Sequence, residues 1–149
     1  MRRKNEEKAK ELLRRGEYTL VLCREESVYT DTRRGVAPLL ALLDASTRVT
    51  GFAAADRVVG KAAAFLYLRL GVAAVHGGVM SQPAYDLLTT HGVLVSADTI
   101  VPAIRNRARD GFCPMETAVW ELTDPVEAET VIRATLKSLT TPQDIVSPM

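Results

Sequence analysis

The chain has 149 residues, of which 47% are hydrophobic and 25% charged, a composition typical of one soluble globular domain spanning 1–149. A formal net charge of +1 and an aromatic content of 5% give no basis for nucleic-acid binding, so no nucleic-acid partner is expected. The longest apolar-rich stretch, Val58 to Leu68, is too short to span a bilayer, and the two cysteines match no zinc or thioredoxin spacing. We therefore expect a cytoplasmic protein without a membrane partner.

Helix and strand signals alternate along the chain. In order, they predict a basic helix at 3–15 within an N-terminal segment 1–16, hairpin strands at 18–23 and 27–30, a helix at 35–43, a strand at 49–55, a helix at 57–70, a strand at 72–80, a helix at 81–90, a strand at 93–95, a short helix from Asp98, and helices that begin at Cys113-Pro114 and Asp124-Pro125. Residues 141–149 contain two prolines and are predicted to form a loose tail. Strands that alternate with helices predict an α/β fold with three α/β/α layers around a mixed sheet.

The helix at 57–70 is expected at the centre of the domain. Its residues are apolar on nearly all sides, which is typical of a helix covered by a sheet or by other helices. Asp56 stands directly before this helix and is predicted to cap its N-terminus, and Gly71 is predicted to end it.

Several short motifs carry a resemblance to a known family. They are Asp56–Ala64, Ser81–Ala84, Val101-Pro102, Asn106-Arg107 and the box Gly111–Glu116. Together they resemble an uncharacterised bacterial and archaeal domain-of-unknown-function family, which is grouped structurally with the cytidine deaminase-like superfamily. The resemblance implies a deaminase-like α/β/α fold, and it does not imply deaminase activity.

The residues argue against zinc-dependent deamination. Zinc deaminases place His-x-Glu at the start of one central helix and Pro-Cys-x-x-Cys at the start of the next. The corresponding helix starts, at 56–61 and 81–84, contain no histidine or cysteine, and His76 and His91 have no partner at ligand spacing. We therefore expect no metal and no other cofactor.

Polar residues are predicted to meet where helix N-termini converge over the sheet. Such termini offer unpaired N–H groups and a partial positive charge, which suit an anion or a polarised carbonyl. Lys61 would add a charged amine there, although a surface amine along an apolar helix is equally consistent with the pattern. Ser81 would offer a hydroxyl, with the N-cap of its helix as the alternative role.

Asn106 and Arg107 lie in a basic stretch between the predicted helices. A guanidinium beside an amide suits the recognition of phosphate or carboxylate, so both residues are candidates for ligand binding. The alternative is a solvated basic stretch without a ligand.

Cys113 and Glu116 are candidates for chemistry. Cys113 precedes Pro114 and is predicted to be an N-cap, a position at which a helix favours the thiolate. Cys113 would then be a nucleophile with Glu116 as its proton acceptor. Alternatively Glu116 folds back on the cap's own N–H in a capping box, as the similar Asp124-Pro-Val-Glu127 pattern indicates, and Cys113 is a small buried hydrophobe.

The predicted function is the binding of a small anionic or nucleotide-like metabolite, or zinc-independent catalysis on such a ligand. Alternatives are a redox-sensing module that uses Cys113 and an interaction protein that uses the basic N-terminal helix. That helix could also pack back on the domain through Leu12 and Leu13, or join two copies in a homodimer. The catalytic candidates are Cys113, Glu116 and Lys61, and the ligand-binding candidates are Asp56, Ser81, Asn106 and Arg107.

Overall fold

The computed structural model describes residues 2–105, 111 and 113–139. Along the chain these residues form α1 (Arg2–Arg15), β1 (Leu20–Arg24), β2 (Ser27–Asp31), α2 (Ala37–Asp44), β3 (Ala53–Val59), α3 (Lys61–Leu70), β4 (Ala74–Ser81), α4 (Gln82–Thr90), β5 (Leu94–Val101), α5 (Pro114–Val119) and α6 (Pro125–Leu139). The order of helices and strands is the predicted one, apart from the short helix expected from Asp98. The predicted loose tail at 141–149 lies outside the described residues.

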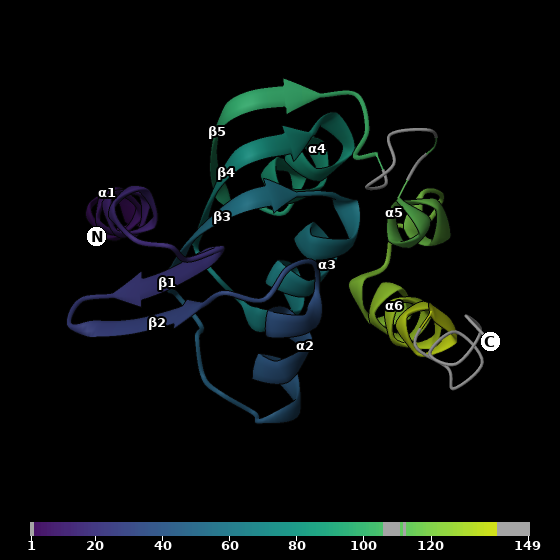
Figure 1. Cartoon of the computed structure of the whole chain (residues 1–149), viewed down its shortest axis with the longest axis horizontal. Helices are drawn as coiled ribbons and strands as arrows, with labels where there is room; N and C mark the ends of the chain where they lie inside the picture. Colours follow the sequence, from purple (N-terminus) through teal and green to yellow (C-terminus); the bar gives the residue numbers. More distant parts are fainter. Residues whose placement is uncertain (1, 106–110, 112, 140–149) are drawn as a thin grey trace.

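The five strands form one mixed sheet in the order β2-β1-β3-β4-β5 (Figure 1). β1 pairs with β2 and with β3 in antiparallel directions, whereas β3, β4 and β5 run parallel to one another. Parallel neighbours require crossover connections, and α3 and α4 supply them. The mixed sheet within an α/β fold is thereby confirmed.

Helices pack on both sides of this sheet (Figure 1). On one side α1 contacts β1, β3 and β4, and Ala9 and Leu13 are buried against Val21, Cys23 and Ala55. On the other side α2, α3 and α4 lie together, and α6 packs on the outer side of α3. The basic helix α1 therefore packs on its own domain, which is one of the alternatives that the sequence leaves open.

α3 is the central helix that its apolar composition predicts. Phe65, Leu66 and Tyr67 are fully buried, and the side chains of α3 contribute to the larger of two hydrophobic clusters. The helix ends at Gly71, whose φ of 76° is left-handed and whose N–H donates to the carbonyl oxygen of Tyr67. None of the helices in the described part of the chain is both long enough and apolar enough to cross a bilayer.

The predicted start of the central helix is wrong. Residues 57–59 belong to β3, with Val58 paired to Val79 of β4, and the helix begins after Gly60. Asp56 is consequently a strand residue and not a helix cap. Consecutive β-branched valines favour the extended conformation, and β4 provides a strand for them to pair with.

The short helix predicted from Asp98 does not begin there. Asp98 lies inside β5, which stays paired with β4 as far as Val101. The segment Thr99-Ile100-Val101 is β-branched throughout, and pairing with β4 satisfies its backbone groups.

Ser81 caps α4, and removing its hydroxyl should destabilise the domain. The buried Ser81 Oγ accepts a hydrogen bond from the N–H of Ala84 at 3.2 Å. We expect Ser81→Ala to lower the free energy of unfolding by about 1 kcal/mol in urea denaturation. Thr90→Ala, at the exposed end of the same helix, is the matched control and should change it by less than about 0.5 kcal/mol. Equal stability of the two variants would contradict the capping role.

Candidate functional site

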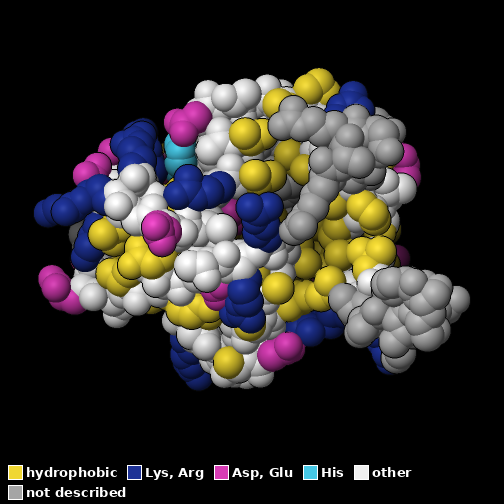
Figure 2. All heavy atoms as spheres, viewed as in Figure 1, with side chains coloured by type: hydrophobic (Ala, Val, Ile, Leu, Met, Phe, Trp, Pro, Cys, Tyr) yellow, Lys and Arg dark blue, Asp and Glu magenta, His cyan; other side chains and the backbone are white. Residues whose placement is uncertain are grey.

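A cavity of about 770 Å³ lies where the N-terminal ends of α2, α3 and α5 meet the end of β3. Apolar side chains form much of its wall, including Val36, Ala63 and Met115, and Leu136 from α6 closes one side. Figure 2 shows hydrophobic side chains gathered over α5 and α6 on this face, with basic side chains beside them. Of the two helix starts predicted to converge, that of α3 lines this cavity together with those of α2 and α5, and that of α4 does not.

Asp56 projects from β3 into this cavity. Its Oδ2 accepts a hydrogen bond from the hydroxyl of the buried Tyr67 at 2.6 Å, and its Oδ1 accepts one from the N–H of Val58 at 3.3 Å. Burial raises the pKa of Asp56 to about 7, although both hydrogen bonds lower it. Near neutral pH the carboxyl group can therefore either donate or accept a proton.

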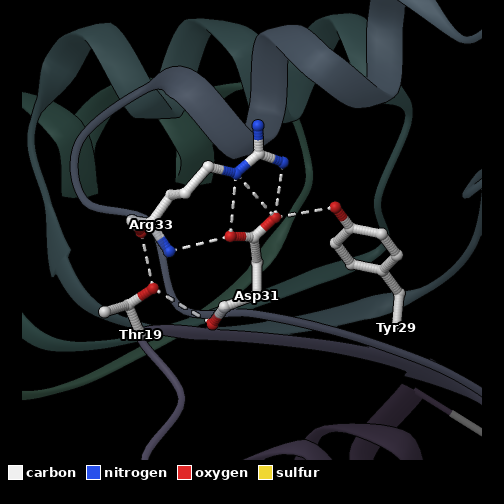
Figure 3. A network of polar contacts seen from close by, with 4 residues as sticks. All are labelled: Thr19, Tyr29, Asp31 and Arg33. Carbon is white, nitrogen blue, oxygen red and sulfur yellow. Dashed lines mark hydrogen bonds and ion pairs between the residues drawn. The ribbon is translucent and has the colours of Figure 1, made fainter.

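Asp31, at the end of β2, holds the side chain of Arg33 beside the cavity (Figure 3). Its carboxylate accepts hydrogen bonds from Arg33 Nη2 at 2.7 Å, from Arg33 Nε at 3.1 Å and from the hydroxyl of Tyr29 at 2.9 Å. The Arg33 guanidinium holds the pKa of Asp31 well below its usual range. Thr19 Oγ1 lies 2.6 Å from the carbonyl oxygen of Arg33 and ties this segment to the start of β1.

Arg34 stands next to this network and lines the same cavity. Its side chain is exposed, and no described residue forms a hydrogen bond or ion pair with it. The charge of Arg33 is compensated by Asp31, so the donors of Arg34, unlike those of Arg33, remain available to a ligand.

Glu116 caps the N-terminus of a different helix from the one predicted. Its carboxylate is 3% exposed and accepts hydrogen bonds from the N–H groups of Lys61 at 2.6 Å and Ala62 at 2.9 Å. A Cβ at Gly60 would lie 2.5 Å from the Glu116 carboxyl carbon, so glycine leaves room for the contact. Burial raises the pKa of Glu116, while the two backbone donors lower it.

The predicted capping box within α5 is therefore wrong. The N–H of Cys113, which Glu116 was expected to bond, donates instead to the carbonyl oxygen of Ile104 at 3.1 Å. The analogous position in α6 is capped as expected, because Asp124 Oδ2 accepts from the N–H of Glu127 at 3.1 Å. In α5 the carboxylate serves the neighbouring helix α3, which offers two free N–H groups.

Cys113 occupies the N-cap position of α5, as predicted, and its side chain forms no capping hydrogen bond. The thiol is free and partly exposed, lines the cavity and packs against the main hydrophobic cluster. Both the nucleophilic and the apolar roles that the sequence leaves open are compatible with this position.

Lys61 and Ser81 lie outside the lining of the cavity. Lys61 Nζ donates to the carbonyl oxygen of Trp120 at 2.7 Å and lies 5.6 Å from the centre of the Phe65 ring, so it links α3 to the end of α5. Burial lowers the pKa of Lys61. Ser81 is enclosed at the start of α4 and serves as its cap. Asn106 and Arg107 lie outside the described residues.

The residues at the two helix starts do not fit the zinc site of a deaminase. α3 starts at Gly60-Lys61 and α4 at Ser81-Gln82, and neither start provides an imidazole or a thiol. Within residues 2–105, 111 and 113–139, no group of three or more His, Cys, Asp or Glu side chains is arranged to hold a metal ion.

Three residues of this region, Arg33, Arg34 and Tyr67, escape prediction from the sequence. Arg33 and Arg34 directly precede Gly35 and the start of a predicted helix. Two arginines in this position are only a weak signal for an anion site, because exposed loops often contain such residues. Tyr67 gives no signal, because a tyrosine in an apolar helix is usually a core residue.

A family model described as TM1506, domain of unknown function (DUF1893), matches residues 8–136. The crystal structure of a DUF1893 family protein (TM1506) from Thermotoga maritima is similar, with 27% sequence identity and a TM-score of 0.77. The similarity covers 89% of this chain and 88% of that chain. None of the curated proteins compared with the chain matches it. The relation to cytidine deaminases stays a prediction.

The raised pKa of Asp56 makes stability depend on pH. Between 3.8, the ordinary value, and about 7, the folded protein keeps a proton on Asp56 that the unfolded chain has lost. The free energy of unfolding should therefore fall as the pH rises through this window. In urea denaturation at several pH values, Asp56→Asn should remove this pH-dependent decrease in the free energy of unfolding. Asp86→Asn, an exposed control on α4, should retain it. The same slope in all three proteins would contradict the assignment.

The cap from Glu116 should be sensitive even to an isosteric change. Glu116→Gln leaves one acceptor oxygen for two N–H groups and turns an amide N–H₂ toward one of them. We expect a loss of about 1–3 kcal/mol in the free energy of unfolding, measured in urea. Glu121→Gln, an exposed control just after α5, should stay close to the wild type. A Glu116→Gln protein of unchanged stability would rule out the cap.

Proposed function

The chain belongs to the DUF1893 family, and we propose that it binds a small anionic, nucleotide-like metabolite in the cavity beside Asp56. The observation that carries this proposal is the make-up of the cavity, about 770 Å³ of space with apolar walls and a few polar groups. Cavities of roughly 300–1,000 Å³ with this composition are the usual binding sites for small molecules.

Arg34 is the group proposed to recognise the anionic part of the ligand. Of the three helix N-termini at the cavity, that of α3 already holds the carboxylate of Glu116. A ligand anion would gain little there, because it would meet a like charge. The guanidinium of Arg34 provides several N–H donors in one plane, which suits phosphate or carboxylate.

Asp56 and the apolar wall are proposed to hold the uncharged part of the ligand. A carboxyl group with a pKa near 7 can pair with either a donor or an acceptor, as an amide or a nucleobase ring offers. Ala62, Ala63 and Met115 line the same cavity and provide an apolar surface for a flat ring. These two contacts favour a nucleotide-like molecule over a simple inorganic ion.

Zinc-independent catalysis is a second candidate function, and the position of Cys113 favours it. Its free thiol is partly exposed in the same cavity as Asp56. A thiolate there would be the nucleophile, and Asp56 is the group with a pKa suited to donating or accepting the proton. Redox sensing at Cys113 would also depend on the partial exposure of its thiol, because an oxidant must reach the sulfur.

A ligand screen with matched variants tests the binding proposal. Nucleotides, nucleosides and phosphorylated sugars are added singly, and a binder should raise the Tm of the wild type. Arg34→Ala should weaken that binding about tenfold, because it removes a charge-assisted hydrogen bond. Arg48→Ala, an exposed arginine outside the cavity, is the matched control and should bind like the wild type.

Protection of Cys113 from alkylation gives a second measurement. A bound ligand should slow the reaction of Cys113 with iodoacetamide, while the buried Cys23 serves as the unreactive internal control. Binding at this cavity would be contradicted if none of the added compounds raised the Tm of the wild type. It would also be contradicted if Arg34→Ala and Arg48→Ala lost the same amount of affinity. A ligand that raises the Tm without protecting Cys113 would place the site elsewhere.

A further inference from the structure

A second cavity, of about 170 Å³, lies on the α1 side of the sheet. At about 30 Å³ per water molecule, its volume corresponds to about six waters, enough for one small ion and too little for a nucleotide. Lys10 and Arg14 of α1, Arg57 of β3, His76 of β4 and Asp98 of β5 line it. Figure 2 shows basic side chains gathered on the α1 side of this face, next to a histidine.

The strand register explains why residues so far apart in the sequence meet here. Ala55, which packs against α1, pairs with His76, and His76 pairs with Ser96. Paired residues share one face of the sheet, and alternate residues along a strand face the same way. Asp98, two residues after Ser96, therefore lies on the side covered by α1.

The lining carries an excess of positive charge. Lys10, Arg14 and Arg57 contribute three positive charges and Asp98 one negative charge, which leaves +2 when His76 is neutral. Lys10 forms an ion pair of 3.3 Å with Glu7, and its side chain is 16% exposed. No described residue forms a hydrogen bond or ion pair with the side chain of Arg14.

Arg57 is held in place by the last turn of α1 and by the segment that follows it. Its Nε donates to the carbonyl oxygen of Tyr18 at 2.7 Å, and its Nη2 lies 3.4 Å from the carbonyl oxygen of Leu13. These contacts position the guanidinium at the cavity without a carboxylate partner, so its charge is available to an anion.

His76 adds a buried polar group that faces the cavity. Its side chain is 6% exposed, and Nδ1 lies 2.8 Å from Ser96 Oγ, which in turn donates to Glu6 Oε2 at 3.1 Å. A serine hydroxyl has one proton, so Ser96 accepts a hydrogen bond from the Nδ1–H of His76. The other ring nitrogen, Nε2, faces Asp98 Oδ1 at 3.5 Å, the outer limit of a hydrogen bond.

We propose that this second cavity binds a tetrahedral oxyanion such as phosphate or sulfate, held by the charges of Lys10, Arg14 and Arg57 and by a hydrogen bond from His76 Nε2. Nδ1 already donates to Ser96, so Nε2 must take up a proton from solvent before it can donate. Binding of the anion is therefore coupled to uptake of one proton by the imidazole.

The charges around His76 set the direction of this coupling. Burial lowers the pKa of His76, the negative charges of Asp98 and Glu6 raise it, and the positive charge of Lys10 lowers it. Arg14 and Arg57 also disfavour the imidazolium, and Glu7 offsets part of the charge of Lys10. An anion bound among these cations would favour the imidazolium. Sulfate should consequently bind more tightly as the pH falls through the titration of His76.

The two histidines of the chain allow a direct NMR test. The imidazole Hε1 resonances are followed against pH with and without sulfate, at constant ionic strength set by chloride. Sulfate carries no titratable proton in this range, so the probe itself does not change charge. We expect sulfate to raise the midpoint of His76 and to leave that of His91, exposed at the end of α4, unchanged.

Two neighbouring arginines provide the matched variants. Arg14→Gln should weaken sulfate binding about tenfold, because one charge-assisted contact is lost. Arg15→Gln removes a charge that is also exposed on the same helix turn but lies outside the cavity, 4.0 Å from Glu11, and this variant should bind like the wild type. If sulfate shifted the titration midpoints of both histidines equally, or if both variants bound sulfate equally weakly, the effect would be a general ionic one and the proposal would be overturned.

Inorganic phosphate and methyl phosphate then distinguish two sources of the anion. A preference for inorganic phosphate indicates a free ion enclosed in the cavity. Equal affinity indicates the phosphoryl group of a larger molecule whose remainder stays outside. Absence of binding by sulfate and by both phosphates would overturn the site.

Discussion

The carboxylate of Glu116 at the N-terminus of α3 is the contact on which the candidate site depends. It joins the start of α5 to the start of the central helix through two short hydrogen bonds. Because both helix starts line the main cavity, this contact sets one of its walls. Gly60 makes the contact sterically feasible, and Lys61 adds a second link from α3 to the end of α5.

This cap also decides where the cavity can take a negative charge. A helix N-terminus attracts anions, but the one at α3 is occupied by a side chain of the same protein. Other charged groups at the cavity include the carboxyl group of Asp56, the arginines after β2 and Arg57. Asp31 compensates the charge of Arg33 and fixes its side chain, and Arg34 is the cation proposed to recognise the ligand. Adjacent arginines thus differ in their partners, because Arg33 forms an ion pair within the protein and Arg34 is proposed to bind the ligand.

Arg57 connects the main cavity with the smaller one on the α1 side. It lines both, and its guanidinium bonds to backbone carbonyls at and after the end of α1. One sequence-based alternative is that the basic helix α1 binds an external partner. In the structure α1 buries Ala9 and Leu13 against the sheet. Its cations Lys10 and Arg14 are thereby brought over His76, and an internal packing contact creates the second proposed site.

The sequence by itself determined the order of helices and strands, the central position of α3 and its end at Gly71, and the caps at Ser81 and Asp124, because these depend on neighbours within a few residues. Only the tertiary structure decided that Asp56 is a strand residue beside Tyr67, that Glu116 caps α3, and that Lys61 and Ser81 lie away from the cavity. Strand pairing with β4 extended β3 and β5 beyond their predicted ends. Such contacts join residues far apart in the sequence, 55 positions in the case of Glu116 and Lys61, and no local pattern encodes them.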